Sequence, residues 1–168
     1  ASRRNRVVAV ASAMGGVTDV LLRSAHEAER GRLGPARKAV AELRERHEAA
    51  AAGVSEETGA AVSFDAAPLA ELETALSGIS LLRERTPRVT DLVASFGERL
   101  SAPLVAAALS ALGVPARAVD ARSFLVTDEK HGSATCDRKK SDPRTRRALG
   151  ALLSKGIVPV VTGFVGRA

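Results

Sequence analysis

The chain has 168 residues, enough for one domain, and its 45% hydrophobic and 26% charged residues exclude wholesale disorder. The net charge of +6 raises the question of nucleic acid, but Arg is mixed with Glu along predicted helices and base-stacking aromatics make up only 2%, so we expect no nucleic-acid partner. The single cysteine, Cys136, excludes an internal disulfide and favours a reduced, cytoplasmic setting.

The first thirty residues predict a strand, a glycine turn and a helix. The run from Arg6 to Ala11 is short, apolar and rich in Val, as in a buried strand. Ser12-Ala13-Met14-Gly15-Gly16 is a turn signal. Apolar residues at helical spacing then predict a helix from Val17 to about Glu29.

The middle of the chain predicts more helices. One covers 33–52 and ends at a break over 53–63, and the next begins near Asp65 and Pro68. A long helical segment is predicted over 88–112, although it contains Gly97 and Pro103, two residue types that are unfavourable inside a helix. We expect the region from about 30 to 85 to be a helical insert or cap.

The last third predicts an alternation of strands and one helix. Strands are expected over 116–120, 124–127 and 157–162, with a loop or hairpin over 128–138 and a helix over 143–155. This alternation predicts an α/β fold with a mainly parallel sheet. Because ligands bind at the carboxyl ends of parallel strands, the two glycine turns that follow strands are candidate site elements.

Other classes of site have little support. The most apolar stretch, 102–119, contains two prolines and Arg117, so we expect no membrane span. The three histidines, His26, His47 and His131, lack the spacing of metal ligands, and Cys136 has no evident catalytic partner. We therefore predict no metal site and no catalytic residue from this sequence.

The turn Ser12 to Thr18 is the best local signal for a ligand. Gly15 and Gly16 let the backbone approach a ligand closely, and the helix that follows offers free amides suited to phosphate or carboxylate. Ser12 and Thr18 add hydroxyl groups. A plain strand-to-helix connection stays open as the alternative, since the turn is neither a Walker loop nor a GxGxxG motif.

A second signal is Ser95-Phe96-Gly97-Glu98. Glycine inside a helix costs about 1 kcal/mol relative to Ala, so Gly97 must gain something, such as close packing or room for a ligand. Glu98 beside it could bind a cationic group such as an α-ammonium, or it could be an exposed side chain paired with Arg99 or another nearby Arg. The turn 163–166 either lines the same crevice or is a simple turn.

Together these segments resemble the aspartokinase family. The resemblance rests on 7–22, 77–109, 113–128 and 156–166, which occur in the family's order and spacing, and it is looser over 30–65. It implies an amino-acid-kinase fold, a three-layer α/β/α sandwich with a mainly parallel sheet, here incomplete. It also implies transfer of the γ-phosphoryl of ATP, with Mg²⁺, to the side-chain carboxylate of L-aspartate, the first step of lysine, threonine and methionine biosynthesis.

The resemblance also implies roles for single residues. By position, Thr18 matches the family's substrate-binding threonine, and Glu98 matches the glutamate that holds the amino group of aspartate. The complete enzyme is expected to be a homo-oligomer that uses ATP and Mg²⁺.

Five further residues match the family around the transferred phosphate. Ser12, Gly15 and Gly16 match the turn near that phosphate, and Gly163 and Phe164 match a turn lining the same cleft. No catalytic residue and no metal ligand is carried over.

The departures from the family limit these expectations. The family's Lys-Phe-Gly-Gly-Thr-Ser strand is not in the sequence, nor are its Gly-Arg-Gly-Gly-Ser-Asp segment, nucleotide-binding half and regulatory ACT domains. We expect residues 1–168 to be part of a catalytic domain that is inactive alone. The alternatives are another amino-acid kinase, against which the block from Ser95 to Pro103 argues, and a degenerate module that binds aspartate or serves in assembly.

Overall fold

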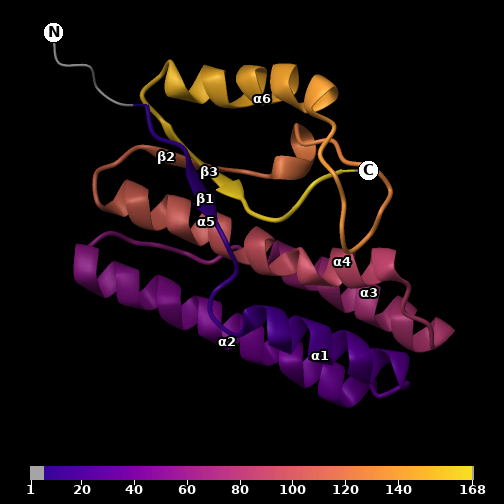
Figure 1. The fold of residues 1–168 in the computed structure, drawn as a ribbon. Coiled ribbons are helices and arrows are strands. Elements are labelled where there is room, and N and C mark those ends of the chain that lie inside the picture. The colour runs from indigo at the N-terminus through magenta and orange to yellow at the C-terminus, as the bar shows by residue number, and fades with distance from the viewer. Residues whose placement is uncertain (1–5, 168) are drawn as a thin grey trace, which may run out of the picture.

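The computed structural model describes residues 6–167, and its sheet has three parallel strands (Figure 1). The strands are β1 (Ala9–Ala11), β2 (Ala116–Val119) and β3 (Val158–Thr162), in the order β1-β3-β2. Val161 of β3 pairs with Val10 on one side and Val119 on the other. This register brings the carboxyl ends of all three strands to one edge of the sheet.

In residues 6–167, six α-helices and one short 3₁₀ helix connect and cover these strands. They are α1 (Val17–Glu29), α2 (Leu33–Thr58), α3 (Ala67–Leu82), α4 (Pro87–Ala94), α5 (Phe96–Ala111), η1 (Ala121–Ser123) and α6 (Arg138–Leu153). Figure 1 shows α6 on one face of the sheet and α5 on the other, with α1, α2 and α3 beyond α5. The predicted α/β/α sandwich is therefore confirmed.

Small side chains join α5 to the sheet. Ala102 and Ala106 of α5 pack against Ala11 and Val160. On the opposite face, Leu149 of α6 packs with Val161 and with residues around η1. Because alanine projects little from a helix, α5 lies close to the strands, and this positions its first turn beside their carboxyl ends.

The largest core lies among the helices, away from the sheet. Leucines and valines of α1, α2 and α3 meet Val93 of α4 and Phe96 and Leu100 of α5 in one cluster. Phe96 is the only aromatic side chain among the fully buried members of that cluster in residues 6–167. The core is therefore mainly aliphatic, in keeping with a sequence in which aromatic residues make up only 2%.

Two predicted helix boundaries are wrong. The helix α2 does not break at 53 but continues through Gly53 to Thr58, and it ends at Gly59 in the left-handed conformation (φ 69°). The helix α6 begins at Arg138, five residues before the predicted start, because the Asp137 carboxylate accepts a hydrogen bond from the Lys140 amide.

Two other predicted elements are corrected. The long helix over 88–112 is divided into α4 and α5 at Ser95, and Thr86 caps α4 by accepting a bond from the Val89 amide. The predicted strand over 124–127 is not formed. It is replaced by two isolated bridges, from Val126 to Arg167 and from Thr127 to Cys136.

One described segment, Pro87–Ala111, is long and apolar enough to cross a membrane by length and composition. Of its most apolar window, 50% is buried inside the fold. The segment is the pair α4 and α5, whose apolar side chains belong to the cores described above, which accounts for its hydrophobicity.

Candidate functional site

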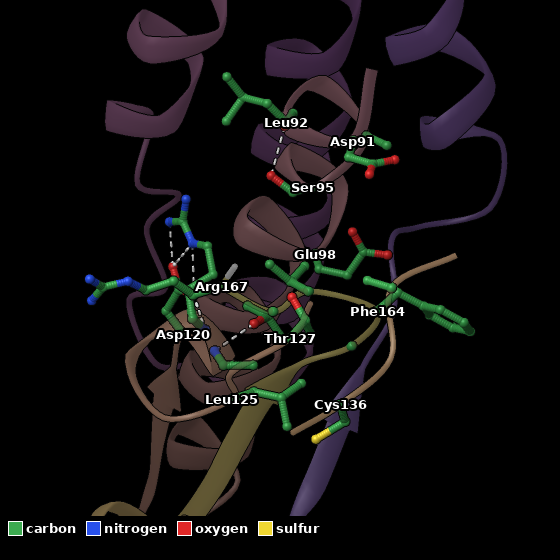
Figure 2. Close-up of a pocket in the computed structure, with 18 of the residues that line it drawn as sticks. Asp91, Leu92, Ser95, Glu98, Asp120, Leu125, Thr127, Cys136, Phe164 and Arg167 are labelled. Atoms are coloured by element: carbon green, nitrogen blue, oxygen red, sulfur yellow. Dashed lines mark hydrogen bonds and ion pairs between the residues drawn. The ribbon is translucent and has the colours of Figure 1, made fainter. Parts of the chain in front are cut away.

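A broad cleft of about 1730 Å³ opens at the carboxyl edge of the sheet. One wall is formed by the ends of the strands and the turns that follow them, and the other by α4 and the first turn of α5. Figure 2 shows side chains from these walls, with Glu98 drawn between Asp91 of α4 and Phe164 of the turn after β3. The cleft therefore lies where the sequence analysis expected a ligand site, at the carboxyl ends of the parallel strands.

The turn after β1 forms the inner corner of the cleft. Gly16 precedes α1 in the left-handed conformation (φ 77°), which glycine adopts at little cost. The Val17 amide donates to the Met14 carbonyl at 3.0 Å and closes the turn. Ser12 and Thr18 line the cleft, whereas Gly15 and Gly16 are exposed beside it and do not line it.

Gly97 lets α5 lie directly against this turn. A Cβ atom at position 97 would be 2.6 Å from the Cβ of Ala13, closer than real side chains approach each other. One turn later, the Ser101 hydroxyl donates to the Ser12 carbonyl at 2.6 Å. The expectation that Gly97 serves close packing is confirmed, and the two contacts fix α5 to the turn.

Glu98 is placed in the cleft by the same packing. It is 8% exposed, lies in the first turn of α5 and lines the cleft together with Thr18. Its carboxylate has no hydrogen bond or ion pair with other residues of the described range 6–167. The carboxylate oxygens of Glu98 are not among the buried polar atoms that lack a partner, so they are accessible from the cleft. A carboxylate placed in this way can bind a cationic group through charge-assisted hydrogen bonds.

The alternative of an exposed Glu98 paired with Arg99 is wrong. Arg99 points away from the cleft, where it forms an ion pair with Glu71 of α3 and lies over the ring of Phe96, 4.5 Å from its centroid. The side chain of Arg99 is only 10% exposed. Glu98 and Arg99 are consecutive in the sequence but serve different parts of the fold.

The turn after β3 closes the sheet side of the cleft. The Gly163 amide donates to the Ala11 carbonyl at 2.8 Å, and a Cβ at Gly163 would be 3.1 Å from that same oxygen. Phe164 follows in the left-handed conformation (φ 51°) and is 100% exposed. A non-glycine residue in this conformation costs about 1–2 kcal/mol, so the turn holds a strained aromatic residue at the mouth of the cleft.

Two polar residues of the cleft were not singled out in the sequence. Asp120, which follows β2, forms an ion pair with Arg122, and the Thr162 hydroxyl accepts a bond from the Ala121 amide at 2.9 Å. Burial by itself raises the pKa of Asp120, but the side-chain and backbone hydrogen bonds from Arg122 outweigh it and hold this pKa below its usual value. Their positions at the carboxyl ends of β2 and β3 were the signal that could have found them.

The cleft thus brings together five of the predicted site residues: Ser12, Thr18, Glu98, Gly163 and Phe164. Across the part of the chain that the structure describes, no three His, Cys, Asp or Glu side chains are grouped in a way that could hold a metal ion. The arrangement offers the Glu98 carboxylate, which has no ion pair in residues 6–167, for a cation, hydroxyl groups for an anion and the start of α1 for a larger anionic group.

Comparisons with known proteins add the family context. A model of the amino acid kinase family matches residues 1–168. Over 101 residues the chain is 37% identical to "Aspartokinase 1, chloroplastic" of Arabidopsis thaliana, covering 59% of this chain and 18% of that protein. Over 112 residues it is 33% identical to "Aspartokinase 3, chloroplastic" of the same plant, covering 66% of this chain and 20% of the relative.

A solved structure shares the fold. It is that of Escherichia coli aspartokinase III in complex with aspartate and ADP, with a TM-score of 0.76 and 23% sequence identity. The match covers 96% of this chain and 34% of that one. The chain therefore spans about a fifth of the length of the two Arabidopsis relatives and about a third of this structural neighbour.

Proposed function

We propose that this chain, which belongs to the amino acid kinase family, is part of an aspartate kinase, an enzyme that transfers the γ-phosphoryl group of ATP to the β-carboxylate of L-aspartate. The observation that carries the proposal is the Glu98 carboxylate, which has no ion pair in residues 6–167 and lines one cleft together with Ser12 and Thr18. The similarity to the Arabidopsis aspartokinases supports the choice of substrate within the family.

Aspartate fits this cleft by its charges. In the proposed complex, Glu98 holds the α-ammonium group through a charge-assisted hydrogen bond. The Thr18 hydroxyl donates a hydrogen bond to a carboxylate of the substrate. Because phosphoryl transfer depends mainly on positioning and on charge neutralisation, these two contacts orient the acceptor carboxylate for attack.

The phosphates of ATP fit the start of α1. Gly15 and Gly16 are exposed there, a Cβ at Gly15 would meet nothing within 4 Å, and the helix presents its free amides. ATP supplies the phosphoryl group when it is bound, and Ser12, Gly163 and Phe164 line the cleft that would receive it. For Mg²⁺ the described residues provide no cluster of ligands, so we assign no step to a metal held by this chain.

Calorimetric titration of the 168-residue chain with L-aspartate tests the proposal. We expect binding, and we expect Glu98→Gln to weaken it about tenfold or more, because the substitution removes one charge-assisted hydrogen bond at a nearly isosteric position. The control is Glu73→Gln on the exposed face of α3, which should bind as the unmodified chain does. Absence of binding, or equal binding by Glu98→Gln, would contradict the proposal.

A second candidate is a module that binds aspartate or serves in assembly without catalysis. It rests on the same cleft, because Thr18 and Glu98 could bind aspartate there without any phosphoryl transfer. We propose that the chain alone does not phosphorylate aspartate, which a coupled assay for ATP- and aspartate-dependent turnover checks. Titration with acetylglutamate in place of aspartate tests the other branch of the family.

The remaining properties of the complete enzyme are proposals of the same kind. We propose a homo-oligomer that uses ATP and Mg²⁺ and serves lysine, threonine and methionine biosynthesis. A cytoplasmic location is proposed from the single cysteine alone.

A further inference from the structure

A polar segment that crosses the cleft has a firm base and a lightly held tip. We call this segment, residues 127–136, the strap. At its base, Thr127 bridges to Cys136, and the Asp128 amide donates to the Thr135 carbonyl at 3.0 Å. The Asp128 carboxylate accepts bonds from the amides of Thr135, at 3.0 Å, and Lys130, at 3.2 Å. These contacts hold the two arms of the strap together.

The base is also joined to the sheet side of the molecule. The Thr127 amide donates to the Arg167 carbonyl at 2.8 Å, and the Asp137 amide donates to the Val126 carbonyl at 2.8 Å. The Ser141 hydroxyl in α6 accepts from the Val126 amide at 2.9 Å. These bonds connect the base to α6 and to the segment that follows β3.

The tip, residues 129–134, is exposed along its whole length. Within the described chain, its hydrogen bonds and ion pairs to residues outside the strap go to a single side chain, Asp91 of α4. The Gly132 amide donates to Asp91 Oδ2 at 2.8 Å, and His131 Nδ1 lies 3.4 Å from the same oxygen. Gly132 turns the chain at this point with a φ of 79°.

The strap joins the two walls of the candidate site. Figure 1 shows it descending from the level of α6 to α4. Strap residues on both arms line the same cleft as Thr18 and Glu98, and Asp91 lines it as well. Asp91, on the helical wall of the cleft, thus holds the tip of the strap, whose base is on the sheet wall.

We propose that Asp91 is a positioning residue that latches the strap across the cleft, and that release of the Gly132 amide from Asp91 opens the cleft to its ligand. The identity of that ligand, L-aspartate, rests on the proposed function. A single hydrogen bond to a partly exposed carboxylate changes an opening equilibrium by about tenfold. The latch is therefore weak enough to open spontaneously and strong enough to slow the escape of a bound ligand.

Hydrogen exchange measured by NMR on the 168-residue chain tests the latch. We expect Asp91→Ala to accelerate exchange of the Gly132 amide about tenfold. Asp91→Asn keeps an acceptor oxygen at the same place and should stay close to the unmodified chain. His131→Ala should also have little effect, because the amide contact of Gly132 is the shorter one. The control Glu84→Ala removes an exposed carboxylate outside the strap and should leave the exchange unchanged.

Two results of this measurement would overturn the latch. One is exchange at Gly132 in Asp91→Ala within about twofold of the unmodified chain, well below the effect of losing such a bond. The other is an equal acceleration of the amides of Val93 and Ser95, because α4 itself would then have loosened.

The effect on the ligand is measured by NMR line broadening of labelled L-aspartate. We expect Asp91→Ala to raise the dissociation rate of aspartate about tenfold, with Asp91→Asn much nearer the unmodified chain. An unchanged dissociation rate together with faster exchange at Gly132 would overturn the gating role. A chain that binds no aspartate contradicts the proposed function instead, while the exchange data still decide whether Asp91 holds the strap.

Discussion

Residue 97 is a glycine, and because it has no side chain, α5 can lie directly against the turn after β1. We expect Gly97→Ala to destabilise the chain by about 1–3 kcal/mol, the usual cost of forcing a methyl group into a packed contact. Chemical denaturation measures this change. The expectation follows from the 2.6 Å that would separate the new methyl from the Cβ of Ala13.

A second substitution tests whether the contact between positions 97 and 13 causes this loss of stability. The double variant Ala13→Gly, Gly97→Ala moves the methyl group to the other side of the contact and should recover part of the lost stability. The control Gly78→Ala, at a position in α3 where a Cβ meets nothing within 4 Å, should be neutral or stabilising. If Gly97→Ala proves as harmless as Gly78→Ala, the close approach of α5 to the turn is wrong.

His47 is a buried titratable residue in the helical core. Its Nδ1 lies 2.7 Å from the Leu43 carbonyl, its ring stacks on Phe64, and its Nε2 has no partner in residues 6–167. Burial lowers the pKa of His47 below its ordinary value of 6.5, the hydrogen bond to Leu43 opposes this, and the charge of Arg46 adds to the lowering. The folded chain therefore holds His47 in the neutral form.

The direction of this shift predicts acid sensitivity. Since the pKa of His47 is lower in the folded chain than in the unfolded one, its contribution is fully present above about pH 6.5 and is lost as the pH falls toward the folded value. The free energy of unfolding should fall by up to about 1.4 kcal/mol per pH unit in that window. Denaturation at several pH values should show a smaller slope for His47→Leu. The exposed position His26 provides the control, and an equal slope in His47→Leu and His26→Gln would contradict the assignment.

Residue types at the site were predictable, but their surroundings were not. Thr18 and Glu98 were selected by their motifs, and both line the cleft. Glu98 is placed by the packing of α5 against the turn after β1, and Arg99 pairs with Glu71, 28 positions earlier in the chain, instead of with Glu98. No local pattern contains such a pairing, so the choice between an exposed and a buried Glu98 could not be made from the sequence.

At the scale of elements, α2 shows how packing outweighs propensity. Gly53 costs the helix about 1 kcal/mol, which predicted a break. The helix continues because Val40, Leu43, His47 and Ala51 bury one face of it against neighbouring helices. Helix boundaries were the least predictable part of the fold for this reason, whereas apolar periodicity placed α1 at its observed bounds.

Replacement by alanine should have opposite effects on stability at Gly53, inside α2, and at Gly59, directly after it. Gly53→Ala should stabilise the chain by about 0.5–1 kcal/mol, since a Cβ there meets nothing within 4 Å and the helical conformation suits Ala. Gly59→Ala, at a φ of 69°, should destabilise it by about 1 kcal/mol, because Ala is strained in the left-handed conformation. Thermal unfolding measures both. Destabilisation by Gly53→Ala would show that α2 ends earlier than Thr58.

At the scale of the whole molecule, the sheet has open edges. In the described chain, β1 and β2 each pair on one side only, and Val10 of β1 is 68% exposed. Open edges with exposed apolar side chains favour association between molecules. We therefore expect the chain to self-associate as its concentration rises.

Sedimentation velocity tests this expectation. Val10→Lys places a charge on the edge strand and should shift the chain toward monomer. The control Val105→Lys introduces the same charge on α5, where the residue is 39% exposed, and should have a smaller effect. A chain that is monomeric at all concentrations, or that responds equally to both variants, would contradict a role for the β1 edge.

The sequence by itself determined the fold class, the turn at 12–18 and the placement of Glu98 in a helical segment, because each of these depends on residues close together in the chain. Only the tertiary structure decided how they combine. The Ser101 hydroxyl meets the Ser12 carbonyl across 89 positions, and the Gly132 amide meets Asp91 across 41. Such contacts depend on how α4 and α5 pack against the sheet and its connecting loops. This packing brings the turn at 12–18 and the first turn of α5 together around one cleft and places the strap across it.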